Sequence, residues 1–233
     1  MRSRAAGCGT GARSARLQFA SRLRLSAARW GLSKGPLRYL AAVLRKQALG
    51  AGDGTLRRKL LWPLYDSLRG EVTASELLAT LDALRSAGVA CWLAGGWGVD
   101  ALVHRQTRRH RDLDIVLDDF ALQAEAALSV LEGLGFRRVR LVRYEIWMPE
   151  RWVLSDVNLR LVDLLGIDWG KLAQGLGVST EVDLRRLAFA EGVVAGRRVP
   201  CLSVPVQLLF HSGYRPRPVE AHDVGLLKEL VGR

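Results

Sequence analysis

Long apolar runs, paired cysteines and several well-known site signatures are missing from this sequence. No stretch approaches 18 consecutive apolar residues, so we expect no transmembrane helix. The three cysteines, Cys8, Cys91 and Cys201, are scattered and form no C-x-x-C pair, which excludes a disulfide framework and a zinc knuckle. The phosphate-binding pattern G-x-x-x-x-G-K-[ST] is absent, and the four histidines lack the spacing of metal ligands. These absences favour a cytoplasmic protein without structural disulfides.

Acidic residues are absent before Asp53, and this distribution decides what the net charge of +12 means. Of the 35 basic residues, 11 precede Asp53, which leaves 24 basic against 23 acidic residues in the rest of the chain. The excess charge therefore belongs to the N-terminal arm. Because the remainder is nearly neutral, we expect no basic groove for nucleic acid.

The first 52 residues are rich in arginine, alanine, glycine and serine, and we expect them to be disordered. Three interpretations of this arm remain open: a mitochondrial-type targeting peptide, a basic tail that contacts anionic surfaces, or a segment upstream of the true start of translation. Residues 53–72 are expected to form a helical linker, and residues 73–233 the folded domain.

From Thr73 onward, helix and strand signals alternate. Thr73-Ala-Ser-Glu76 has the spacing of a capping box, and Gly88 supplies the stop of the helix that follows. The downstream patterns predict, in order, a strand at Val89–Ala94, a turn at Gly95-Gly96, a helix at Trp97–His104, a strand at Leu113–Leu117 and a helix at Phe120–Leu134.

The second half of the sequence is dominated by strand patterns and ends in two helices. Extended segments are predicted at 137–143, 144–148, 152–155, 159–165, 192–194 and 197–202, and helices at 206–212 and 219–231. This order of elements indicates the α+β class, with a mixed sheet flanked by helices and a small helical segment at the C-terminus.

Two aspartates stand on a predicted core strand. Because side chains alternate along a strand, Asp112 and Asp114 share one face, while Leu113 and Ile115 share the core face. Two adjacent carboxylates repel each other, and a divalent cation such as Mg²⁺ or Mn²⁺ removes that conflict. An edge strand with a solvated outer face remains the alternative explanation.

Two further features lie near this pattern in the predicted fold. Gly95-Gly96, between a strand and a helix, offers open backbone N–H groups that suit an anion, although a tight turn with positive φ would also need glycine. Asp163 shares a predicted face with Leu161 and Leu165, where a lone carboxylate is costly unless it is paired, bound to metal or close to water. A third carboxylate from a neighbouring strand would complete a two-metal site.

The segment "WLAGGWGVDALVHRQTRRHRDLDIVL" resembles the DNA-polymerase-β-type nucleotidyltransferase superfamily, with its pattern of G-[GS], D-x-[DE] and a later carboxylate. More narrowly, it is similar to the aminoglycoside 2″-adenylyltransferases and lincosamide nucleotidyltransferases, as is the C-terminal "GRRVPCLSVPVQLLFHSGY". The resemblance covers about residues 73 to 230. It implies the polymerase-β-like fold.

The resemblance also implies roles for individual residues. Gly95 and Gly96 would face the nucleoside triphosphate. Arg108, Arg109 and Arg111 lie just before the aspartates and could reach its phosphates, although this basic loop could also be merely solvated. Asp112 and Asp114 would bind two Mg²⁺ ions, with Mn²⁺ as the alternative. Asp163 would be the third ligand and the base on the acceptor hydroxyl. Relatives often have V-D-L-H-P here, whereas this chain has Leu165 in place of the histidine, so Asp156 and Asp168 are alternative candidates.

The function implied is the transfer of AMP from a nucleoside triphosphate to a hydroxyl group of a small molecule, such as an aminoglycoside- or lincosamide-like antibiotic, with release of pyrophosphate. A protein or an RNA end as acceptor, or a catalytically silent nucleotide-binding relative, are the alternatives. We expect a monomer or a homodimer whose partners are the nucleotide and a small hydroxylated acceptor.

Overall fold

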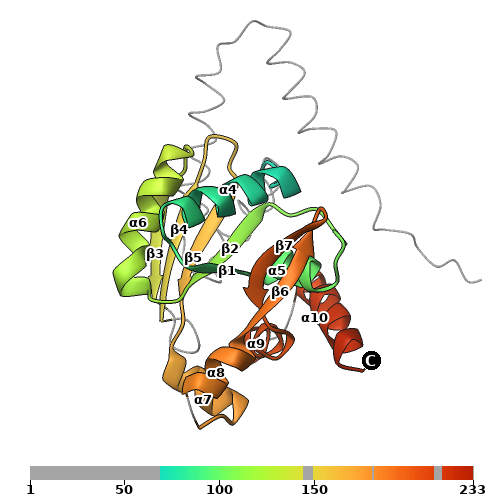
Figure 1. Cartoon of the computed structure of the whole chain (residues 1–233). Coiled ribbons are helices and arrows are strands. Elements are labelled where there is room, and N and C mark those ends of the chain that lie inside the picture. The colour runs from blue at the N-terminus through green and yellow to red at the C-terminus, as the bar shows by residue number, and fades with distance from the viewer. Residues whose placement is uncertain (1–68, 144–148, 180, 213–216, 233) are drawn as a thin grey trace, which may run out of the picture. The chain divides into compact units, whose positions relative to one another are not determined.

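A computed structural model describes residues 69–143, 149–179, 181–212 and 217–232 (Figure 1). The predicted arm at 1–52, most of the predicted linker at 53–72 and the predicted strand at 144–148 lie outside these residues. From Gly70 onward the chain forms one compact unit. None of the helices in the described ranges combines the length and the apolar character needed to cross a lipid bilayer.

The unit is built around a seven-stranded mixed sheet, which confirms the predicted α+β class. The strands are β1 (Cys91–Ala94), β2 (Asp112–Leu117), β3 (Arg137–Arg143), β4 (Glu150–Ser155), β5 (Leu161–Gly166), β6 (Phe189–Val194) and β7 (Arg197–Leu202). Their order across the sheet is β3-β4-β5-β2-β1-β7-β6. The pairs β1–β7 and β2–β5 are parallel, and the remaining neighbours are antiparallel.

Helices cover both faces of the sheet (Figure 1). Leu113, Ile115 and Leu117 of β2 are buried in the same core cluster as side chains of α4 and α6, while Val116 packs on the opposite face with α7, α8 and α9. Asp112 and Asp114 therefore lie on the face of α7–α9. The helices are α4 (Ala74–Ser86), α5 (Gly95–Leu102), α6 (Phe120–Gly133), α7 (Trp169–Leu176), α8 (Glu181–Ala188), α9 (Val204–Phe210) and α10 (Pro218–Val231).

The start of α4 confirms the predicted capping box. The hydroxyl of Thr73 accepts a hydrogen bond from the Glu76 amide at 3.3 Å, and the Glu76 carboxylate accepts one from the Thr73 amide at 2.9 Å. These reciprocal bonds satisfy two N–H groups that the first helical turn leaves open. The helix ends before Gly88, whose φ of +75° suits glycine.

Three local predictions need correction. Gly95-Gly96 is not a separate turn but the start of α5, which begins two residues earlier than predicted and ends at Leu102. Strand β2 begins at Asp112 rather than Leu113, so both aspartates belong to the strand. Helices α7 and α8 have no counterpart among the predicted elements. They depend on packing against the sheet through Leu172 and Leu184, and sequence periodicity in such short helices is a weak signal.

Candidate active site

Strand β2 presents the two aspartates side by side on one face. Asp112 and Asp114 are half-buried, whereas Leu113 and Ile115 between and beyond them are buried in the core. The predicted alternation is therefore confirmed. Because β2 lies in the middle of the sheet, the edge-strand explanation for the aspartates is excluded.

Asp163 lies directly beside Asp114 on the neighbouring strand. Strands β2 and β5 are parallel, and their register pairs Asp114 with Asp163. Adjacent strands lie about 4.8 Å apart, and paired residues point to the same face of the sheet. Asp163 is 2 % exposed, and its Oδ1 atom is buried without a hydrogen-bond partner in the structure. The structure thus brings the three predicted carboxylates onto one face of two adjacent strands.

Gly95 lies close to Asp114, on the side opposite to Asp163. Register pairs Ala94 at the end of β1 with Asp114, and Gly95 follows at φ +56°. A Cβ atom at Gly95 would overlap the carboxylate of Asp114, lying 2.8 Å from its Cγ atom. Glycine is required here both for the backbone conformation and for the close approach of β2. The first N–H groups of α5 follow at this point, and such groups favour anions.

Arg108 covers Gly96 and is held there by the C-terminal helix. Its Nε and Nη2 atoms donate to the two carboxylate oxygens of Asp223 in α10, at 3.0 and 2.7 Å, and its guanidinium would be the nearest neighbour of a Cβ atom at Gly96. Burial alone would lower the pKa of Arg108, but the bonds to Asp223 and the nearby carboxylates, Asp112 included, raise it. Arg108 is therefore a fixed positive charge beside the glycine pair.

Arg109, one of the three arginines predicted to reach phosphate, points elsewhere in this structure. Its side chain is 87 % exposed and forms an ion pair with Glu71, with the Nε and Oε2 atoms 3.7 Å apart. Of these two neighbouring arginines, Arg108 is the one beside Gly96. Arg109 stays a sequence-based prediction, and Arg108 is the better placed candidate.

A buried carboxylate–imidazole pair, absent from the sequence-based predictions, ties α5 to the loop before β2. His110 Nε2 and Asp100 Oδ2 lie 2.6 Å apart, and each side chain is 1 % exposed. Thr107 donates two more hydrogen bonds to this carboxylate, from its amide and its hydroxyl. The pair anchors the segment that leads into Asp112. Its sequence signal is the acidic residue within the otherwise apolar helix Gly95–Leu102.

Arg151 is a further residue near the carboxylates that the sequence-based predictions missed. It lies on β4 opposite Leu165, and its Nη2 atom donates a hydrogen bond to Asp163 Oδ2. The register pairs Val153 with Asp163, so Arg151, two residues away, shares their face of the sheet. Arg151 becomes a neighbour of Asp163 only through the register between β4 and β5, and the sequence pattern does not predict that register.

The two alternative carboxylates have structural partners of their own. Asp156 accepts hydrogen bonds from the amides of Asn158 and Arg160 and from the Arg160 guanidinium, which closes the turn between β4 and β5. Asp168 caps the start of α7 by accepting a bond from the Lys171 amide. Neither position pairs with Asp114 in the sheet, whereas Asp163 does.

The donor set suits a hard divalent cation. Three carboxylates provide only oxygen ligands, which Mg²⁺ and Mn²⁺ prefer, and the unpartnered buried Oδ1 of Asp163 is an atom that a cation would satisfy. Within the described residues, no three acidic, histidine or cysteine side chains already lie close enough to enclose a metal ion. Since Arg151 engages Asp163, a centre built from all three acids requires the third carboxylate to reorient.

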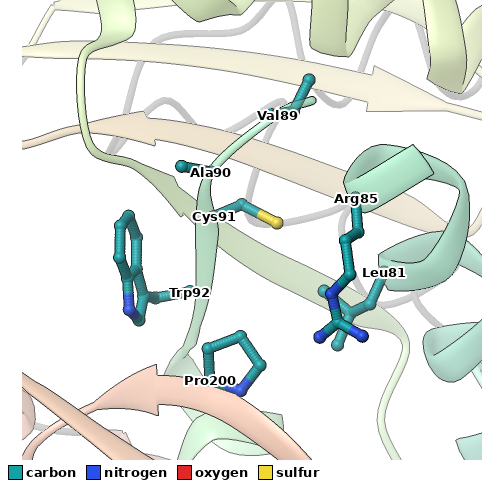
Figure 2. Close-up of a pocket in the computed structure, with 7 residues that line it drawn as sticks. All are labelled: Leu81, Arg85, Val89, Ala90, Cys91, Trp92 and Pro200. Carbon is teal, nitrogen blue, oxygen red and sulfur yellow. The ribbon is translucent and has the colours of Figure 1, made fainter. Parts of the chain in front are cut away.

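A separate cavity at the opposite end of β1 has no carboxylate in its walls (Figure 2). Its volume is about 220 Å³, and Arg85, Cys91, Trp92 and Pro200 contribute to its walls. Register pairs Cys91 with Leu117, at the far end of β2 from the aspartates. Burial raises the pKa of the Cys91 thiol to about 11, so at neutral pH the thiol is protonated and a poor nucleophile.

Replacing Arg108 by methionine is expected to lower the free energy of unfolding by about 3–5 kcal/mol, because the buried carboxylate of Asp223 loses its compensating charge. Urea unfolding followed by circular dichroism measures the change. Arg197→Met is the matched control: it removes an equally bidentate arginine, but its pair with Asp82 is about half exposed, so the loss should be much smaller. Equal losses in both variants would contradict this role of Arg108.

Comparison with known proteins places this chain in a family. The family model of aminoglycoside-2''-adenylyltransferase matches residues 76–227. A lincosamide resistance protein of Staphylococcus haemolyticus is 34 % identical over 164 residues, which are 69 % of this chain and 97 % of that protein. A 2''-aminoglycoside nucleotidyltransferase of Escherichia coli is 30 % identical over 113 residues, 48 % of this chain and 57 % of that one.

Solved structures agree on the fold. The lincomycin-bound lincosamide antibiotic adenylyltransferase LnuA aligns with a TM-score of 0.52 at 32 % identity, covering 68 % of this chain and 98 % of that chain. ANT(2")-Ia in complex with adenylyl-2"-tobramycin aligns with a TM-score of 0.52 at 20 % identity, covering 68 % and 89 %. The resemblance in the sequence is thereby confirmed, and the chain belongs to the aminoglycoside-2''-adenylyltransferase family of antibiotic-inactivating nucleotidyltransferases.

Proposed function

We propose that this protein transfers AMP from ATP to a hydroxyl group of a small antibiotic-like acceptor in the cytoplasm. The proposal depends on one observation, the alignment of Gly95, Asp114 and Asp163 across three adjacent strands. Gly95 follows the end of β1, Asp114 lies on β2, and Asp163 lies beside it on β5. A phosphate-binding helix start and carboxylates for the reacting groups are thereby next to each other. The family of the chain supports the same reaction.

In this reaction, the acceptor oxygen forms a bond to the α-phosphorus while the bond from that phosphorus to the bridging oxygen breaks and pyrophosphate leaves. The backbone N–H groups at Gly95 and Gly96 would hold triphosphate oxygens at the start of α5. Arg108 would add a positive charge beside them. Asp163, which would also hold a cation, would accept the proton of the attacking hydroxyl through its carboxylate.

Mg²⁺ is the proposed cofactor, in two ions, with Mn²⁺ as the alternative. Asp112, Asp114 and Asp163 would hold the cations, which when bound supply positive charge against the triphosphate and lower the pKa of the attacking hydroxyl. Because the chain contributes mainly position and charge, the geometry of the carboxylates determines the rate.

A lincosamide is the first acceptor to test. The sequence match spans 97 % of the lincosamide resistance protein but 57 % of the aminoglycoside nucleotidyltransferase. Incubation with ATP, Mg²⁺ and lincomycin is expected to release pyrophosphate and to yield an acceptor heavier by one AMP unit, as measured by mass spectrometry. EDTA should abolish the reaction. If no hydroxylated acceptor in a panel of lincosamides and aminoglycosides gains a nucleotide, the proposed function is wrong.

A further inference from the structure

We propose that Arg151 selects the acceptor by charge: it disfavours acceptors with several ammonium groups and admits neutral or singly charged ones. This inference rests on the transfer reaction proposed above and assigns a specificity-determining residue to it. Arg151 reaches the site from β4, and its guanidinium donates a hydrogen bond to Asp163.

The order of strands places Arg151 on the acceptor side. From β5 to β1, the register places Asp163, Asp114 and Ala94 side by side, and Gly95 follows Ala94. On β4, Arg151 lies two residues from Val153, the partner of Asp163, and shares its face. In an in-line displacement, the attacking oxygen and the leaving pyrophosphate lie on opposite sides of the phosphorus. With the triphosphate at Gly95, the acceptor therefore approaches over β5 and β4, where Arg151 lies.

Arg151 is the outer member of its ion pair. The side chain of Asp163 is 3 % exposed, whereas that of Arg151 is 28 % exposed. An acceptor that approaches the buried carboxylate meets the guanidinium first. An ammonium group next to the reacting hydroxyl would then lie close to a like charge, which is unfavourable in a partly buried site.

The strands on the acceptor side, β4 and β5, add no surplus of negative charge to that of Asp112 and Asp114 on β2. On this face of β4 and β5, Arg151 and Asp163 are the charged residues, and they neutralise each other. The other side chains of that face are neutral: Val153, Ser155, Leu161 and Leu165. These four side chains are buried, so on β4 and β5 the partly exposed Arg151 is the charge that an acceptor meets.

The test compares lincomycin, which has one amine, with tobramycin, which has several. Arg151→Gln is expected to raise the ratio of kcat/KM for tobramycin to that for lincomycin about tenfold, and Arg151→Lys should keep the original ratio. Arg198→Gln is the control, because it removes the same charge from an exposed pair with Glu191. Calorimetric titration without nucleotide should show tighter tobramycin binding to Arg151→Gln.

A measurement on the unaltered protein guards against a variant that fails to fold. Salt screens repulsion, so raising NaCl should lower the KM for tobramycin relative to that for lincomycin, whereas attraction by an acidic site would raise it. An unchanged ratio in folded Arg151→Gln, or the opposite salt response, overturns the selection by Arg151. If no acceptor is modified at all, the transfer reaction is wrong, and the calorimetric comparison still decides the role of Arg151.

Discussion

Replacing Asp114 by asparagine is expected to lower the rate of nucleotidyl transfer by at least about 10³-fold, the scale of losing a group that stabilises transition-state charge. Asp114 stands at the centre of the row, paired with Ala94 on one side and with Asp163 on the other. Asparagine keeps the shape of the side chain but removes the charge that would bind a cation. Because the change relieves repulsion between neighbouring carboxylates, the fold should be retained. Pyrophosphate release and the unfolding midpoint measure the two effects separately.

Asp118→Asn is the matched control for this variant. It removes one negative charge from the residue that follows the same strand, at the end remote from Asp112, where the carboxylate pairs with Arg185. Transfer by this protein should stay close to that of the unaltered chain. An Asp114→Asn protein that retained comparable activity would show that the three-carboxylate site does not carry the reaction.

Much of this site could be predicted from local pattern. Alternation along a strand places Asp112 and Asp114 on one face without any knowledge of the fold, and the buried side chains opposite them follow from the same rule. The glycine pair and the third acid were likewise predicted from residue type and spacing. What these predictions share is that each depends on residues close in the sequence.

The missing parts depend on contacts between distant segments. That Asp163 lies beside Asp114, rather than elsewhere along β2, is a matter of register, and a slip by one residue would turn its side chain to the core face. Arg151 belongs to the site because β4 is the next strand in the sheet. Arg108 was among the arginines predicted to reach phosphate, but its partner Asp223 lies 115 residues further along the chain.

The need for glycine at position 95 could be predicted from the sequence only in part. A glycine between a strand and a helix predicts a positive φ or an anion, and the structure adds a third reason, the side chain of Asp114 against its α-carbon. This close approach joins the start of α5 to the row of carboxylates at a position with no side chain of its own.

Gly95→Ala is therefore expected to reduce stability and transfer together, whereas a matched variant reduces stability alone. The left-handed backbone at φ +56° costs about 1–2 kcal/mol for alanine, and the new methyl group must displace the Asp114 carboxylate. A displacement of about 1 Å lowers turnover about 10²-fold.

Gly88→Ala isolates the first of these effects, because Gly88 has φ +75° but no atom within 4 Å of the added carbon. Urea unfolding should show similar losses of stability for Gly88→Ala and Gly95→Ala, while initial rates of pyrophosphate release should fall only for Gly95→Ala. Since both substitutions strain the backbone in the same way, a fall in rate for Gly95→Ala alone comes from the site itself, through the contact at Asp114 or the N–H groups at the start of α5. Equal rates in the two variants would mean that the carboxylate tolerates the methyl group and that Gly95 is present for its conformation alone.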